Sequence, residues 1–90
     1  MSRISNRQLE VMAEVLNAML DNRGSSARVV TEGRNGYHAI DLTTADDLVN
    51  RPGTAIKTLR TGTTGELWAY LYAMQEGIFL VSEPYVENDA

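Results

Sequence analysis

The stretch RVVTEGRNGYHAIDL, residues 28–42, decides the fold of this chain. Its first part is short and β-branched, and the dipeptide Asn35-Gly36 is the strongest signal for a tight turn between two strands. After the turn the side chains alternate, with one face formed by His38, Ile40 and Leu42 and the other by Tyr37, Ala39 and Asp41. This pattern predicts a β-hairpin with strands at about 27–32 and 37–42.

The segment before the hairpin predicts an amphipathic helix. Ser5 and Gln8 have the S-x-x-Q spacing of a capping box, and Gly24 can adopt the left-handed conformation that ends a helix. Apolar residues recur at helical spacing between these two signals. They are Leu9, Met12, Ala13, Leu16 and Leu20, widened by Val11, Val15, Ala18 and Met19. We predict a helix at about 6–22.

A second helix is predicted near the other end of the chain. Thr63 and Glu66 repeat the capping-box spacing, and Leu67, Leu71 and Met74 follow on one helical face. Gly77 is a plausible stop, so the helix is expected at about 64–76.

The remaining segments give weaker signals. Residues 43–50 are expected to form a loop, with a short helical turn as the alternative, and 54–61 a third strand. The run 78–81 is apolar and predicts either a short fourth strand or an apolar plug. Pro84 and three acids predict a flexible acidic tail over 82–90, after one globular domain at 1–81.

These elements together predict an α+β fold in the order α-β-β-β-α. Each helix offers one apolar stripe, so a small antiparallel sheet with both helices packed on one face follows. Ninety residues make one domain with a thin core, and the composition of 43% hydrophobic and 22% charged residues is ordinary for a globular protein. We expect a cytoplasmic protein, because the chain has no cysteine and no apolar run of signal-peptide or membrane-span length.

The sequence offers no catalytic or metal-binding constellation, and we expect no cofactor. Without cysteine there is no thiolate nucleophile or Cys-based zinc site. His38 is the one histidine, and no serine has the context of an activated nucleophile. Asp41, Asp46 and Asp47 are close in sequence but lack the spacing of a calcium loop, so they are interpreted as strand-end and helix-cap charges.

The sequence bears on two kinds of anion binding, of nucleic acid and of a small anion. The net charge of −4 disfavours nucleic acid. The element order is shared with double-stranded-RNA-binding domains, but the lysines that such domains carry at the start of the last helix are absent here. A basic sheet face remains an alternative, formed by Arg28, Arg34, Arg51, Lys57 and Arg60. The turn Thr63-Thr64-Gly65 could hold a small anion on free backbone N–H groups, although a well-capped turn is the simpler interpretation.

The aromatic residues of the second helix point in different directions. Trp68 and Tyr72 align at i and i+4, whereas Tyr70 points roughly opposite. In one interpretation the Trp68 and Tyr72 rings are partly buried and their polar atoms are exposed to water. In the other they form a contact surface that Ile78 and Phe79 extend. The sequence leaves these two interpretations open.

Parts of the chain resemble a recurring pattern in small uncharacterised proteins of bacteriophages and prophages. The resembling stretches are residues 6–10 with Leu16-Asn17, Gly36-Tyr37, and 62–71 running on to Gly77-Ile78. The resemblance implies a phage accessory protein of unknown activity and carries over no catalytic residue. We therefore expect a non-enzymatic protein that binds a host or phage protein, with a homodimer as one form. A nucleic-acid-binding regulator and a binder of a small anion are the alternatives.

Overall fold

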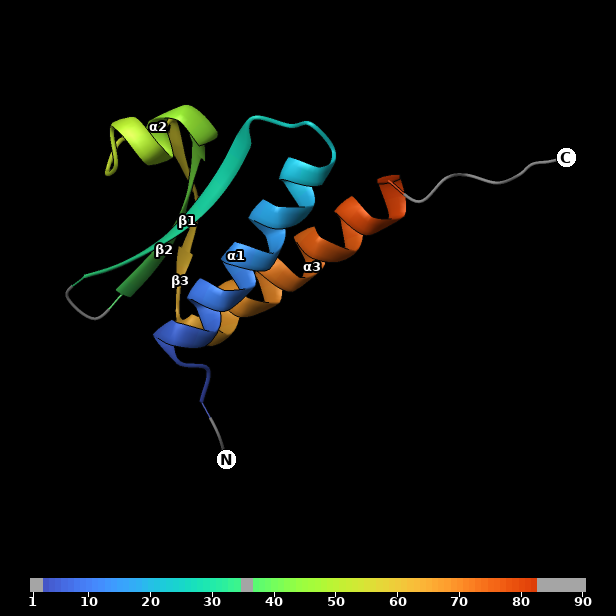
Figure 1. Cartoon of the computed structure of the whole chain (residues 1–90). Coiled ribbons are helices and arrows are strands. Elements are labelled where there is room, and N and C mark those ends of the chain that lie inside the picture. Colours follow the sequence, from blue (N-terminus) through green and yellow to red (C-terminus); the bar gives the residue numbers. More distant parts are fainter. Residues whose placement is uncertain (1–2, 35–36, 83–90) are drawn as a thin grey trace, which may run out of the picture.

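A computed structural model describes residues 3–34 and 37–82. Its elements are α1 (Asn6–Asn22), β1 (Ala27–Arg34), β2 (Tyr37–Thr44), α2 (Ala45–Asn50), β3 (Lys57–Gly62) and α3 (Thr64–Ser82). The strands form an antiparallel sheet in the order β1-β2-β3, and α1 and α3 lie side by side on one face of it (Figure 1). The predicted α+β class, the antiparallel sheet and the two helices on one face are confirmed.

Helix α1 begins and ends where its capping signals predict. The Ser5 Oγ accepts a hydrogen bond from the Gln8 backbone N–H at 3.1 Å, and the Gln8 Oε1 accepts one from the Ser5 N–H at 2.8 Å. Gly24 has φ 77°, and the N–H of Ser25 donates to the Leu20 carbonyl at 3.0 Å. The left-handed residue thus closes the helix by satisfying carbonyls of its last turn.

The hairpin is also confirmed, with strands two residues longer than predicted. In the β1–β2 register Val29 lies opposite Leu42 and Arg34 lies opposite Tyr37. The two turn residues, Asn35 and Gly36, lie outside the described residues. The alternation along β2 places Ile40 in the core and Asp41 on the other face, as the pattern predicts.

The main core fills the space between the helices and the sheet. Its buried members are Leu9, Ala13, Leu16, Val29, Ile40, Leu67 and Leu71. They come from α1, β1, β2 and α3, so these four elements share one apolar layer. The other face of the sheet is partly covered by α2 and the segment 51–56, which leads into β3.

Three sequence predictions need correction. The fourth strand at 78–81 is wrong, because α3 continues without interruption to Ser82. Residues 43–50 form the helical alternative rather than a loop: Thr43 and Thr44 end β2, and the short helix α2 follows, capped by the hydrogen bond from the Asp47 N–H to Thr44 Oγ1 at 3.0 Å. The third strand begins at Lys57 rather than at residue 54, after a segment that turns over the sheet.

The end of α3 explains the first error. Gly77 lies within the helix and does not adopt the left-handed conformation that would stop it. Ile78 lies one turn after Met74, and both pack against the core. The helical spacing therefore continues through a short apolar run that alone cannot distinguish a helix from a strand. The acidic tail predicted at 82–90 lies outside the described residues, except for Ser82.

Candidate functional site

The exposed side of the two packed helices carries an apolar surface. We call it the helix-pair surface, and it consists of Val11, Met12, Val15, Trp68 and Tyr72. The first three come from α1 and the two aromatic residues come from α3. The surface exists because α1 and α3 pack together along their lengths (Figure 1), which brings side chains more than fifty positions apart into one patch.

The Trp68 and Tyr72 rings stack on each other. Their centroids are 5.3 Å apart and the ring planes differ by 10°. Trp68 is half-buried and packs against the core, whereas 46% of Tyr72 is exposed. Trp68 is therefore the partly buried ring of the stack, and Tyr72 is the ring that faces solvent. A stack held from below by the core is a rigid aromatic feature of the surface.

Val11 and Val15 continue the apolar surface onto α1. They remain 42% and 40% exposed, and with Met12 and Trp68 they line a shallow groove of about 370 Å³. The lining of the groove also includes three polar side chains, those of Arg7, Gln8 and Gln75. An apolar centre with a polar margin is the usual arrangement at a protein–protein interface.

Sequence reasoning included Trp68 and Tyr72 in the contact surface but did not include the two valines. The sequence feature that could have identified Val11 and Val15 is the extra width of the apolar face of α1. Leu9, Ala13 and Leu16 form the buried stripe of α1. The apolar side chains of Val11 and Val15 lie outside this stripe, so they face solvent or a partner.

Ile78 and Phe79 lie further along α3 than the Trp68–Tyr72 stack. Ile78 lines a second apolar groove, which it shares with Leu20, Arg23, Met74 and Gly77. Phe79 follows on α3 and is 51% exposed. The C-terminal half of α3 therefore has apolar side chains both beside α1 and facing outward.

The turn before α3 already holds a carboxylate. Glu66 Oε1 accepts a hydrogen bond from the Thr63 backbone N–H at 2.9 Å, and Thr63 Oγ1 accepts one from the Glu66 N–H at 3.1 Å. Hydrogen bonds to the carboxylate from the Thr63 backbone and the Thr63 side chain, with the charge of Arg60, hold the pKa of Glu66 below its usual value. The resident negative charge disfavours a second anion at Thr63, Thr64 and Gly65, so anion binding there stays a prediction without geometric support.

The basic residues do not gather on one face of the sheet. Arg28 pairs with Asp21 at 2.9 Å and Arg51 with Asp47 at 2.7 Å. The Arg60 guanidinium lies over the Tyr70 ring, 5.8 Å from its centroid. These cations are thus spread over different elements and are engaged locally, which does not favour a continuous phosphate-binding surface.

The candidate metal ligands are also separated. Asp47 pairs with Arg51, Asp46 accepts a hydrogen bond from Asn50, and Asp41 accepts one from Thr58. Within residues 3–34 and 37–82, no group of three or more histidine or acidic side chains is placed to hold a metal ion. In the same part of the chain, no helix is long and apolar enough to cross a membrane.

The comparisons with known proteins add no relative. No family model, no curated protein and no solved structure matches this chain.

Proposed function

We propose that this chain is a small non-enzymatic accessory protein, of the phage type that its sequence resembles, which acts by binding another protein. The binding site in this proposal is the helix-pair surface. Its partner is a protein of the bacterial host or of the phage, a second copy of this chain included, and the place of action is the host cytoplasm.

The observation that carries the proposal is the stacked Trp68–Tyr72 pair beside Val11 and Val15. Tyr72 and the two valines each leave two-fifths or more of their surface exposed, although they lie beside Met12 and Trp68, which pack against the core. Burying such surface against a partner is favourable by roughly 25 cal/mol per Å². Trp and Tyr are also the residues that most often dominate binding energy when an interface surrounds them.

The test places one lysine in the centre of the surface. Val15→Lys and Tyr72→Lys each bring a charge into the contact without removing a buried core residue. Val49→Lys is the matched control, because Val49 is 78% exposed and lies on α2 rather than on either helix of the surface. We expect the first two variants to weaken partner binding by about thirtyfold or more, a typical hot-spot effect, and the control to bind normally.

Two measurements distinguish the partners. Light scattering over a range of concentrations shows whether the wild-type chain pairs with itself, and affinity capture from host and phage-infected lysates shows other partners. Support requires a dimer or a captured protein that is lost with Val15→Lys and Tyr72→Lys and retained with Val49→Lys. A wild-type monomer whose captured proteins are the same for all three variants would show that the proposal is wrong.

A further inference from the structure

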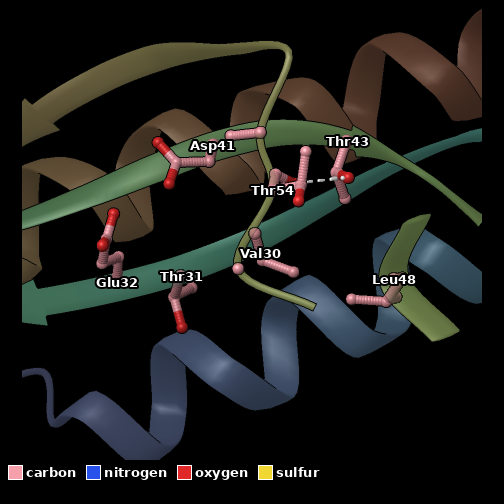
Figure 2. Close-up of a pocket in the computed structure, with 9 residues that line it drawn as sticks. Val30, Thr31, Glu32, Asp41, Thr43, Leu48 and Thr54 are labelled. Atoms are coloured by element: carbon pink, nitrogen blue, oxygen red, sulfur yellow. Dashed lines mark hydrogen bonds between the residues drawn. The ribbon is translucent and has the colours of Figure 1, made fainter. Parts of the chain in front are cut away.

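A separate pocket lies on the face of the sheet opposite α1 and α3. It is formed where the segment 51–56 and α2 cover part of β1 and β2, and its volume is about 190 Å³ (Figure 2). The side chains that line it on the sheet are Val30, Glu32, Asp41 and Thr43, and those from the covering segments are Leu48, Thr54 and Ala55. Thr31 and Gly53 complete the lining, although the Thr31 side chain points toward α1.

Asp41 is a buried carboxylate in this pocket. Only 7% of the residue is exposed, and Asp41 Oδ1 accepts a hydrogen bond from the Thr58 hydroxyl at 2.8 Å. Among the described residues, no lysine, arginine or histidine forms an ion pair with it. A buried negative charge is costly unless a cation or several donors compensate it.

The threonine hydroxyls of the site supply only one donor to Asp41. Thr43 Oγ1 donates its one hydrogen to the Thr54 carbonyl at 2.9 Å, and Thr58 Oγ1 donates its hydrogen to Asp41. Each hydroxyl has one hydrogen and two lone pairs, so both oxygens are left as acceptors. Glu32 adds a second carboxylate at the same end of the pocket as Asp41 (Figure 2).

The other end of the pocket contains the apolar side chain of Leu48, with Thr43 and Thr54 on the same side (Figure 2). Leu48 lies across the pocket from the two carboxylates, and Val30 lies between them (Figure 2). A cavity of about 150 Å³ accepts a molecule as large as benzene, so this pocket has room for a chain of a few carbons. The pocket therefore suits a ligand with two different ends. One end carries a positive charge and hydrogen-bond donors, and the other end is aliphatic.

We propose that this pocket binds a primary ammonium group carried on a short aliphatic chain. An ammonium group has three donors and no acceptor, which complements the Asp41 carboxylate. A divalent metal ion fits less well, because no group of three or more histidine or acidic side chains converges within the described residues. The pocket and the helix-pair surface lie on opposite sides of the sheet, so this inference does not depend on the proposed function.

The experiment is a titration of the whole isotope-labelled chain with n-butylammonium chloride, followed by amide NMR. We expect saturable shifts at residues lining the pocket, with none for n-butanol, which has the same chain length without the charge, or for magnesium chloride at matched ionic strength. Shifts caused equally by butanol, shifts caused by magnesium alone, or no saturable shift at the pocket with butylammonium would each overturn the proposal.

Variants tie the binding to the two ends of the pocket. Asp41→Asn keeps the acceptor for Thr58 but removes the charge, and we expect about tenfold weaker binding. Leu48→Ala shortens the apolar wall at a residue that is already 36% exposed. We expect about threefold weaker binding from this second variant, which still tests the pocket if Asp41→Asn does not fold. Glu14→Gln, which removes a carboxylate on α1, is the control and should bind like the wild type. Unchanged affinity in both pocket variants would overturn the assignment.

A further arm distinguishes two sources of the ammonium group. N-acetyl-lysine methylamide presents the same head on a peptide backbone. If it binds as well as butylammonium, the natural ligand is a lysine side chain of a protein; if only the free amine binds, the ligand is a small amine. Both outcomes retain the ammonium site, and failure of both ligands rejects it.

Discussion

At the scale of single residues, the capping box of α3 depends on the charge of Glu66. Its carboxylate accepts the Thr63 N–H and lies near Arg60, and these contacts lower its pKa from the ordinary value of 4.5. The folded state therefore binds this proton less readily than the unfolded state. The resulting stabilisation is fully present above pH 4.5 and is lost as the pH falls through the lower folded-state pKa.

The variant Glu66→Gln isolates this effect, because a glutamine can still accept the Thr63 N–H but carries no charge. We expect the wild type to be more stable than the variant at neutral pH and the difference to shrink toward zero in acid. Urea unfolding of both proteins between about pH 7 and about pH 3 measures it. A difference that is constant over this range, or that grows in acid, would contradict the lowered pKa.

At the scale of elements, Gly77 distinguishes the observed α3 from the shorter helix that the sequence predicts. Gly77 lies in the helix interior, and an added Cβ would meet nothing within 4 Å. Alanine is favoured over glycine in a helix by about 1 kcal/mol. We therefore expect Gly77→Ala to raise the free energy of unfolding by about 0.5–1 kcal/mol.

Gly24→Ala is the control for this measurement. Space is also open around Gly24, but its φ of 77° is unfavourable for alanine. We expect this control to lower the stability by about 1 kcal/mol. If both substitutions destabilise the protein to a similar extent in denaturant unfolding, Gly77 terminates the helix after all and α3 ends near residue 76.

Local signals account for the elements that the sequence predicted correctly. The Ser5–Gln8 box and Gly24 define both ends of α1, and the alternation of residues 37–42 defines the buried face of β2. The wrong predictions concern segments whose structure depends on tertiary packing rather than on local sequence. A glycine marks a helix end only if the chain turns there, and Ile78, the residue after Gly77, packs against the core.

The candidate sites show the same limit. The i, i+4 spacing of Trp68 and Tyr72 predicts that they share a face, and they do stack. No local pattern could show that Val11 and Val15 lie beside them, because that requires the packing of α1 against α3. The Asp41 pocket was not predicted either, since it depends on how the segment 51–56 returns over the sheet.

At the scale of the whole molecule, the sheet separates two surfaces of different chemistry. The helix-pair surface is apolar and aromatic and suits a protein partner, whereas the opposite pocket is negative at one end and suits a small cation. The two surfaces can therefore be changed independently. Val15→Lys should leave butylammonium binding unchanged, and Asp41→Asn should leave partner binding unchanged, which makes each proposal a control for the other.

A polar contact between Asn17 and Val29, in addition to the apolar core, joins the helix layer to the sheet. Asn17 of α1 is half-buried. Its Nδ2 donates to the Val29 carbonyl at 2.9 Å, and its Oδ1 accepts from the Val29 N–H at 2.8 Å. The side-chain amide thus pairs with both backbone groups of one residue of β1, an edge strand of the described sheet.

Removing this amide should weaken the whole fold rather than one element. Asn17→Ala leaves a partly buried N–H and carbonyl of Val29 without their partner, and we expect a loss of about 1–3 kcal/mol in the free energy of unfolding. Asn22→Ala, an exposed change in the same helix, has the same gain in helix propensity and is the control. Denaturant unfolding gives the two free energies, and hydrogen exchange shows whether the Val29 amide loses protection. Equal stability of the two variants, with Val29 still protected, would show that the apolar core alone holds α1 against the sheet.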